Sequence, residues 1–179
     1  MITAMPRPGT LLSRAPHPPY LPHIPTFSVR SARPRDAAAL AALSRPFIRS
    51  GALRERPFHV YAWQATDFLV AEAPDGTLDG CLALRVDPEP TRDGRALGVL
   101  YNFCVAQHMQ GSGVGARLLG AALARGRAQS LDALFTATTG SGRLFLRYAF
   151  APACPSLAPA AWARSLDPAR GARVLGRVL

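Results

Sequence analysis

The sequence has 179 residues, of which 49% are hydrophobic, and this length suits one domain with a sizeable core. No apolar run reaches the length of a membrane span, and the three widely spaced cysteines fit neither a metal pattern nor a secreted disulfide framework. The net charge is +10, but no nucleic-acid-reading motif is recognised. We therefore expect a protein of the reducing cytoplasm that binds neither membrane, metal nor nucleic acid, and whose positive charge attracts an anionic cofactor and an acidic substrate.

Residues 1–25 are predicted to form an extended, disordered tail, and residues 26–179 the folded domain. The tail contains seven prolines, a density that blocks the hydrogen bonding of helices and sheets. It also carries arginines and no acidic residue, like an organelle transit peptide. A start codon placed too early explains the tail equally well, since Met5 offers a second start.

Prolines and glycines predict where the helices of the domain begin and end. Pro34 and Asp36 suit the first turn of a helix, because proline lacks the N–H that is unsatisfied there and a carboxylate stabilises the positive end. Pro46 should interrupt this helix, and Gly51 should stop a short second one. Residues 59–65 fit either helix or loop. Helices are expected at 37–43, 47–50, 117–127 and 142–148.

Apolar runs between turns predict the strands. Residues 97–105 are almost wholly apolar and should form a central strand that is buried on both faces. Residues 74–76, Pro-Asp-Gly, form a turn that joins two other strands into a hairpin. Residues 152–167, rich in proline and alanine, should form a long connection. The expected strands, which make a mixed α/β sheet, are 27–30, 68–72, 78–86, 97–105, 133–138 and 173–179.

Residues 105–116, V-A-Q-H-M-Q-G-S-G-V-G-A, join the predicted central strand to the longest helix through a glycine-rich turn. Such a turn presents free backbone N–H groups and the positive end of a helix dipole, which together suit a phosphate or pyrophosphate. A Walker loop is excluded because the chain contains no lysine, and a dinucleotide fingerprint lacks its acidic residue after the next strand.

The loop resembles the acetyl-CoA loop of the GCN5-related N-acetyltransferases (GNAT), in which Arg/Gln-x-x-Gly-x-Gly/Ala follows a strand that ends in valine. The resemblance implies a mixed, mostly antiparallel central sheet flanked by helices, with the loop between the central strand and the main helix. It also implies acetyl-CoA as co-substrate. By position, its binding residues would be Phe103, Cys104, Val105, Gln110, Gly111, Ser112, Gly113, Val114, Gly115 and Ala116.

Further stretches resemble one branch of this family, the N-acetylglutamate synthases, in their short form that consists of the acetyltransferase alone. They are residues 44–56, the hairpin that contains Gly80-Cys81-Leu82-Ala83-Leu84, the Thr-Thr-Gly-Ser turn at 138–141 and the closing strand. This branch carries out the first step of arginine biosynthesis, acetylating the α-amine of L-glutamate. A chain without the kinase-like domain of the longer form should lack any arginine feedback that depends on that domain.

The resemblance implies that Arg45, Arg54 or Arg56 faces the carboxylates of glutamate, with Ser141 on the opposite wall. The chemistry fits, because planar guanidinium groups bind carboxylates through two parallel hydrogen bonds. Each of these arginines, among 21 in the chain, is equally well explained as a solvated surface charge.

Direct transfer requires a neutral amine and stabilisation of the thioester oxyanion, which backbone amides beside the central strand can provide. The glutamate that many relatives use as base is replaced by Val99, and their tyrosine acid by Phe145. Tyr101 and Cys104 on the central strand are the catalytic candidates, Tyr101 as an acid or a water anchor. Both also fit as ordinary buried strand residues.

Two other interpretations stay open at this stage. A GNAT enzyme for another amine, such as a polyamine, an antibiotic or a protein N-terminus, would favour an acidic pocket. A non-catalytic acyl-CoA-binding or nucleic-acid-binding module would bind without turnover. His59 and His108 are single histidines that would serve as bases only if the fold places them well. The resemblance also allows a homodimer, which is common in the family.

Overall fold

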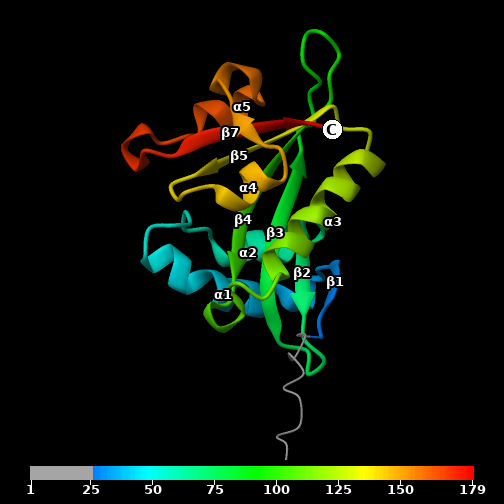
Figure 1. Cartoon of the computed structure of the whole chain (residues 1–179), viewed down its shortest axis with the longest axis vertical. Coiled ribbons are helices and arrows are strands. Elements are labelled where there is room, and N and C mark those ends of the chain that lie inside the picture. The colour runs from blue at the N-terminus through cyan, green and yellow to red at the C-terminus, as the bar shows by residue number, and fades with distance from the viewer. Residues whose placement is uncertain (1–25) are drawn as a thin grey trace, which may run out of the picture.

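The computed structural model describes residues 26–179, so the predicted tail lies outside the described residues. These residues build a seven-stranded sheet in the order β1-β2-β3-β4-β5-β7-β6 (Figure 1). Neighbouring strands are antiparallel except β4 and β5, which are parallel. The strands are β1 Ser28–Ser31, β2 Phe68–Glu72, β3 Leu78–Val86, β4 Leu97–Val105, β5 Ala133–Thr138, β6 Ala151–Pro152 and β7 Arg173–Val178.

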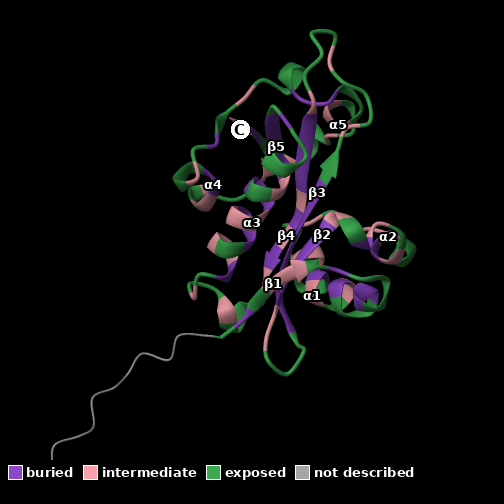
Figure 2. Cartoon of the chain, turned by 90° about the vertical axis from the view of Figure 1, so that its right-hand side faces the viewer, coloured by how far each residue is buried: buried purple, intermediate pink, exposed green. Residues whose placement is uncertain are grey.

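Helices cover both faces of the sheet, as Figure 2 shows for α3 and α4 on one side and α1 and α2 on the other. Among the described residues, no helix is both long enough and apolar enough to cross a membrane. The helices are α1 Ala37–Arg49, α2 Phe58–Trp63, α3 Val114–Ala128, α4 Arg143–Arg147 and α5 Ala160–Arg164.

Alternation along the strands divides the buried side chains between the two faces. On one face, Leu82 and Leu100 pack with Leu118 and Leu119 of α3. On the other, strand side chains pack against Leu40 of α1 and the ring of Tyr61 in α2. Helices thus pack on both faces of a central sheet, which confirms the predicted mixed α/β fold and places β4 between helices on both sides.

β4 occupies the middle of the sheet, as predicted from its apolar run. Its first four residues, from Leu97 to Leu100, are buried on both faces, and after them buried and half-buried positions alternate. The expectation of full burial therefore holds for the first half of the strand. In the second half, Tyr101, Phe103 and Val105 are half-buried.

Two features open the sheet beside β4. Its parallel pairing with β5 runs through Leu97, Gly98 and Val99, and the strands then separate. Figure 1 shows β5 and β7 crossing the upper part of the molecule at a wide angle to β3 and β4. A bulge follows in β4, where the pairing with β3 shifts register and Asn102 has a φ of 50°. Such bulges bend a strand and redirect its side chains.

Two sequence expectations were wrong. α1 continues through Pro46 without a break. Proline removes the hydrogen bond to the carbonyl of Ala42, but both residues are exposed, so water can satisfy that carbonyl. The expected connection at 152–167 contains α5, a helix that the run Ala160-Ala161-Trp162-Ala163 supports by its helix propensity.

Candidate active site

The glycine-rich loop has the geometry of an anion cradle. After β4, residues Gln107–Met109 form a single 3₁₀ turn, and Gly111 and Gly113 then adopt φ values of 84° and 93°. Side chains rarely tolerate this left-handed backbone, which explains glycine at both positions. Gly113 caps α3, so the amides of Val114, Gly115 and Ala116 lie in the first helical turn and have no preceding turn to bond. The loop therefore fits a pyrophosphate.

Two other candidates for acetyl-CoA binding, Phe103 and Val105, lie beside this loop on the α3 side of β4. Phe103 and Val105 pack towards α3, and a Cβ at Gly115 would lie 3.3 Å from the ring of Phe103, so glycine permits this close approach. Gln110 folds back and donates from Nε2 to the carbonyl of Val105 at 3.3 Å. Ser112 donates to the carbonyl of Met109 at 2.5 Å. These contacts fix the shape of the turn.

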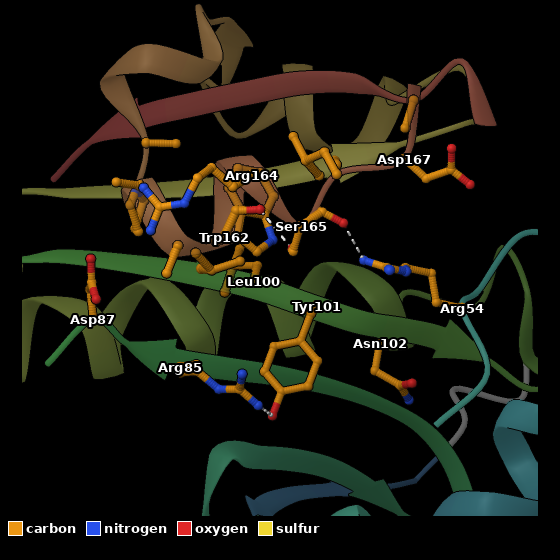
Figure 3. A pocket seen from close by; sticks show the side chains of 18 of the residues that line it. Arg54, Arg85, Asp87, Leu100, Tyr101, Asn102, Trp162, Arg164, Ser165 and Asp167 are labelled. Atoms are coloured by element: carbon orange, nitrogen blue, oxygen red, sulfur yellow. Dashed lines mark hydrogen bonds between the residues drawn. The ribbon is translucent and has the colours of Figure 1, made fainter. Parts of the chain in front are cut away.

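A cavity of about 1090 Å³ begins where β4 separates from β5 and extends between the β3–β4 loop and α5. Val99, Leu100, Tyr101 and Asn102 of β4 form its floor, and Trp162 of α5 lies opposite, as Figure 3 shows. This volume is in the range of small-molecule sites. In the described part of the chain, no cluster of three or more His, Cys, Asp or Glu side chains could hold a metal ion.

Comparison with protein families decides between the types of anion-binding fold. The model of the acetyltransferase (GNAT) family matches residues 37–150, which include the opened sheet and the glycine loop. The chain belongs to the acetyltransferase (GNAT) family. The resemblance to this family, drawn from residues 105–116, is therefore confirmed.

Two similar proteins match most of this chain. An amino-acid acetyltransferase of Ralstonia nicotianae is 33% identical over 122 residues, which are 68% of this chain and 26% of that protein. The N-acetylglutamate synthase of Neisseria gonorrhoeae, solved with coenzyme A and N-acetyl-glutamate, is 28% identical with a TM-score of 0.77. That match covers 86% of this chain and 35% of the synthase chain, so this chain spans about a third or less of both relatives.

A third GNAT structure matches over nearly its whole length. Rv2747 from Mycobacterium tuberculosis, solved in complex with CoA, has a TM-score of 0.68 and 24% identity. The alignment covers 85% of this chain and 99% of that one. At this identity the likeness shows a shared fold.

Arginines dominate the charged lining of the GNAT cavity. Arg54 and Arg56, two of the predicted substrate-binding residues, both line it. Arg54 donates to the carbonyl of Ser165 at 2.8 Å (Figure 3). Arg56 is half-buried, and its burial lowers the pKa of its guanidinium. The other arginines of the lining, which sequence reasoning missed, are Arg85, Arg92, Arg164 and Arg170.

The remaining predicted substrate-binding residues lie apart from this lining. Arg45 is an exposed residue of α1 and does not line the cavity. Ser141 is exposed between β5 and α4, and its carbonyl accepts a hydrogen bond from Arg173 at 3.0 Å. From the same turn, Thr139 does reach the cavity. The structure therefore gathers Arg54 and Arg56 with four unforeseen arginines, and leaves Arg45 and Ser141 outside.

Tyr101, a catalytic candidate, is held in a polar network on the cavity floor. Its hydroxyl donates to Oδ2 of Asp67 at 2.7 Å. The guanidinium carbons of Arg56 and Arg85 lie 4.6 and 5.0 Å from the centre of its ring. Burial, followed by the bond to Asp67, raises the pKa of Tyr101 well above its ordinary value. The hydroxyl is therefore protonated at neutral pH.

Cys104, the second catalytic candidate, is buried and faces α1 and α2. Its Sγ lies 3.4 Å from Sγ of Cys81 on β3. The hydrogen bond to Cys104, together with burial, raises the pKa of the Cys81 thiol. A buried pair of cysteines packs as apolar side chains do, and Cys104 does not line the cavity.

The positions at which GNAT relatives carry acid and base groups are apolar here. Val99 is buried on the cavity floor, and Phe145 packs between Phe103 and Phe150. Tyr148 instead donates its hydroxyl to the carbonyl of Ala116 in the first turn of α3, at 2.9 Å. Catalysis in this cavity must therefore rely on backbone groups, on the charged side chains of the lining and on the polar side chains around Tyr101.

Neither candidate histidine reaches the cavity. His59 packs against Trp63 in α2, with the ring centres 4.7 Å apart and the ring planes tilted by 46°. His108 lies in the turn before the glycine loop, where its Nε2 is 3.3 Å from Oδ1 of the buried Asp79. Both positions explain the histidines without a catalytic function.

Proposed function

We propose that this chain transfers the acetyl group of acetyl-CoA directly to the α-amine of L-glutamate. The observation that carries the proposal is the charge of the cavity. Six arginines line it, against the three acids Asp87, Glu89 and Asp167. Glutamate brings two carboxylates, and guanidinium groups in a partly desolvated cavity bind carboxylates strongly.

The relatives support the same substrate class. The Ralstonia protein is an amino-acid acetyltransferase, and the Neisseria synthase was solved with N-acetyl-glutamate bound. The two matches cover 68% and 86% of this chain. An acidic amino acid also agrees with the overall excess of positive charge, which attracts anionic ligands towards the protein.

The glycine loop and β4 bind different parts of acetyl-CoA. Amides of the glycine loop and the first turn of α3 bind its pyrophosphate, with the residues from Gln110 to Ala116 as the contact segment. Phe103 and Val105 pack against the same core as α3, beside this loop. When bound, acetyl-CoA supplies a thioester carbonyl that an amine can attack. Backbone N–H groups of β4 beyond Val99, released from the parallel ladder, stabilise the oxyanion.

The chain contributes mainly position and electrostatics to the reaction. With Val99 in place of a carboxylate, no side chain of β4 is a strong base at neutral pH. The attacking amine must therefore lose its proton to water or to a weak acceptor before transfer. We expect the rate to rise with pH towards the pKa of the amine, with most of the acceleration coming from orientation.

A thiol-release assay with acetyl-CoA and single amino acids tests the proposal. Turnover with L-glutamate, and at most a small fraction of that turnover with glutamine and lysine, is the expected result. Arg54→Met should raise the KM for glutamate and leave the KM for acetyl-CoA unchanged. Turnover with cationic amines but not with glutamate would contradict the proposal and assign Asp87 and Glu89 to the acceptor.

A further inference from the structure

Asn102 occupies a special position in β4. It lies in the bulge with a φ of 50°, three residues after Val99, where the pairing of β4 with β5 ends. Its side chain is 5% exposed, and the residue lines the cavity next to Tyr101 (Figure 3). A polar side chain at this point lies between α1 and the place where the acetyl group is transferred under the proposed function.

The hydrogen bonds of Ser44 fix the orientation of the Asn102 amide. Ser44 is fully buried in α1, and its single hydroxyl proton is donated to the carbonyl of Leu40 at 2.8 Å. The Ser44 oxygen can therefore only accept a bond from Asn102, which donates from Nδ2 at 2.9 Å. Cys81 Sγ accepts a second, longer contact from Nδ2 at 3.6 Å. The NH₂ group thus faces α1 and β3, and Oδ1 is directed elsewhere.

Oδ1 of Asn102 is buried, and among the described residues it has no hydrogen-bond partner. Nε of Arg56, another residue of the cavity lining, has none either. Buried polar groups in folded proteins are almost always paired, so each unpaired group calls for an explanation. These two are complementary: one accepts and the other donates. An amino acid has the matching pair, an amine that donates and a carboxylate that accepts.

We propose that Oδ1 of Asn102 accepts a hydrogen bond from the acceptor amine and holds that amine beside the separation of β4 and β5. Arg56 Nε then donates to a carboxylate of the same molecule. This inference rests on the proposed function for the presence of an amine acceptor, but not on glutamate being that acceptor. Asn102 is thereby a catalytic residue that the sequence did not mark.

The amide oxygen suits this work better than an apolar side chain would. An amine nitrogen that forms a bond to a carbonyl carbon gains positive charge until it loses a proton. A buried oxygen that accepts from this N–H group therefore binds more strongly as the reaction proceeds, which is the condition for catalysis. Because the amide is neutral and anchored to Ser44, it needs no reorganisation when the substrate binds.

A purely structural explanation for Asn102 predicts different behaviour. Asparagine is one of the residues that tolerate positive φ, so Asn102 would then be present to form the bulge. Glycine tolerates that backbone without strain. Asn102→Gly therefore keeps the bulge accessible while it removes the acceptor oxygen. Tyr61→Phe is the matched control, since it removes a buried hydroxyl that has no partner among residues 26–179 and does not line the cavity.

The test compares steady-state kinetics of the wild type and these two variants with the best amine acceptor in an amino-acid panel. For Asn102→Gly we expect kcat/KM for the acceptor to fall by about tenfold or more, with the KM for acetyl-CoA within about twofold. Tyr61→Phe should match the wild type. Binding affinity gives a second readout. The wild type should bind glutamate more tightly than glutarate, which lacks the amine, and Asn102→Gly should bind both with the same affinity.

The outcomes separate this inference from the proposed function. Turnover on glutamate that Asn102→Gly leaves unchanged overturns the inference alone. An equal loss for acceptor and acetyl-CoA also overturns it, because that loss reflects a distorted bulge. Turnover on another amine, with the expected loss in Asn102→Gly, overturns the glutamate assignment and supports the inference. Failure to acetylate any amine overturns both.

Discussion

The hydroxyl of Tyr101 donates to Oδ2 of Asp67 at 2.7 Å, and this bond links the floor of the cavity to the turn that precedes β2. Arg85 lies beside the same pair, with its Nε 3.6 Å from Asp67 Oδ2. Tyr101 therefore acts with Asp67 as part of a charged network, and its proton is already engaged when substrate arrives.

Replacing Tyr101 by phenylalanine tests what this network does. The ring still contacts Arg56 and Arg85, but Asp67 loses the hydrogen bond from the Tyr101 hydroxyl and Arg85 loses its contact with that hydroxyl. We expect kcat/KM for the acceptor to fall by about 2- to 10-fold, which corresponds to one hydrogen bond. Because the pKa of Tyr101 is raised, the wild-type pH–rate profile should show no loss of activity up to pH 10 from ionisation of this group. If the wild type lost activity below pH 10 and Tyr101→Phe did not, this account would be contradicted.

Gly113→Ala tests the acetyl-CoA loop. Gly113 has a φ of 93° at the start of α3, a conformation that costs alanine about 1–2 kcal/mol. The KM for acetyl-CoA should rise by about tenfold as the first-turn amides shift. Gly120→Ala is the matched control: it lies inside α3 with open space at its Cβ, and alanine there should stabilise the helix by about 0.5–1 kcal/mol. Equal kinetics in the two variants would refute the function of the loop.

Arg56→Met tests the carboxylate site. The substitution keeps an apolar side chain but removes the half-buried guanidinium from the cavity. The KM for glutamate should rise by about tenfold or more, with that for acetyl-CoA unchanged. Arg127→Met removes the same charge from an exposed position of α3 and should behave as wild type. A similar rise in both variants would mean that overall charge, not the cavity, attracts the substrate.

Asp36→Asn tests an ion pair that holds the start of α1. Asp36 accepts from Arg30 at 2.6 Å, and this bond lowers the pKa of Asp36 below its ordinary value of 3.8. A lowered carboxyl pKa stabilises the fold above pH 3.8, and this contribution is lost as the pH falls through the folded-state pKa. The variant should therefore lose about 1–3 kcal/mol of unfolding free energy at pH 7 and approach wild type below pH 4. Urea unfolding from pH 3 to 7 measures the difference, with exposed Glu55→Gln as control.

Local patterns were sufficient to predict most of the fold. The bounds of β2, β3, β4 and β5 were predicted to the residue, because each apolar run is framed by polar or turn-forming residues. α1 was predicted too short, because Pro46 was expected to break the helix. Pro46 lies on the exposed side of α1, where water can satisfy the carbonyl that loses its hydrogen bond. The glycine loop was predicted because backbone conformation there requires glycine at fixed spacing.

The cavity was harder to predict because it is assembled from distant segments. Arg85 lies near the end of β3, Arg164 in the predicted connection at 152–167, and Arg170 between that connection and β7. No periodicity brings them together, and the separation of β4 from β5 is what opens the space between them. Asn102 carried no sequence signal at all, because its unpaired oxygen follows from the bulge and from the bond of Ser44 to Leu40.

Competition between acceptors is the most direct test of the central claim. The enzyme is given acetyl-CoA and an equimolar mixture of the common amino acids, and the acetylated products are identified by mass spectrometry. Because all acceptors compete for one enzyme, the initial product ratios report the ratios of kcat/KM. We predict that N-acetylglutamate dominates. A mixture in which glutamate stays unmodified while another amino acid is acetylated would contradict the assignment of this cavity to glutamate.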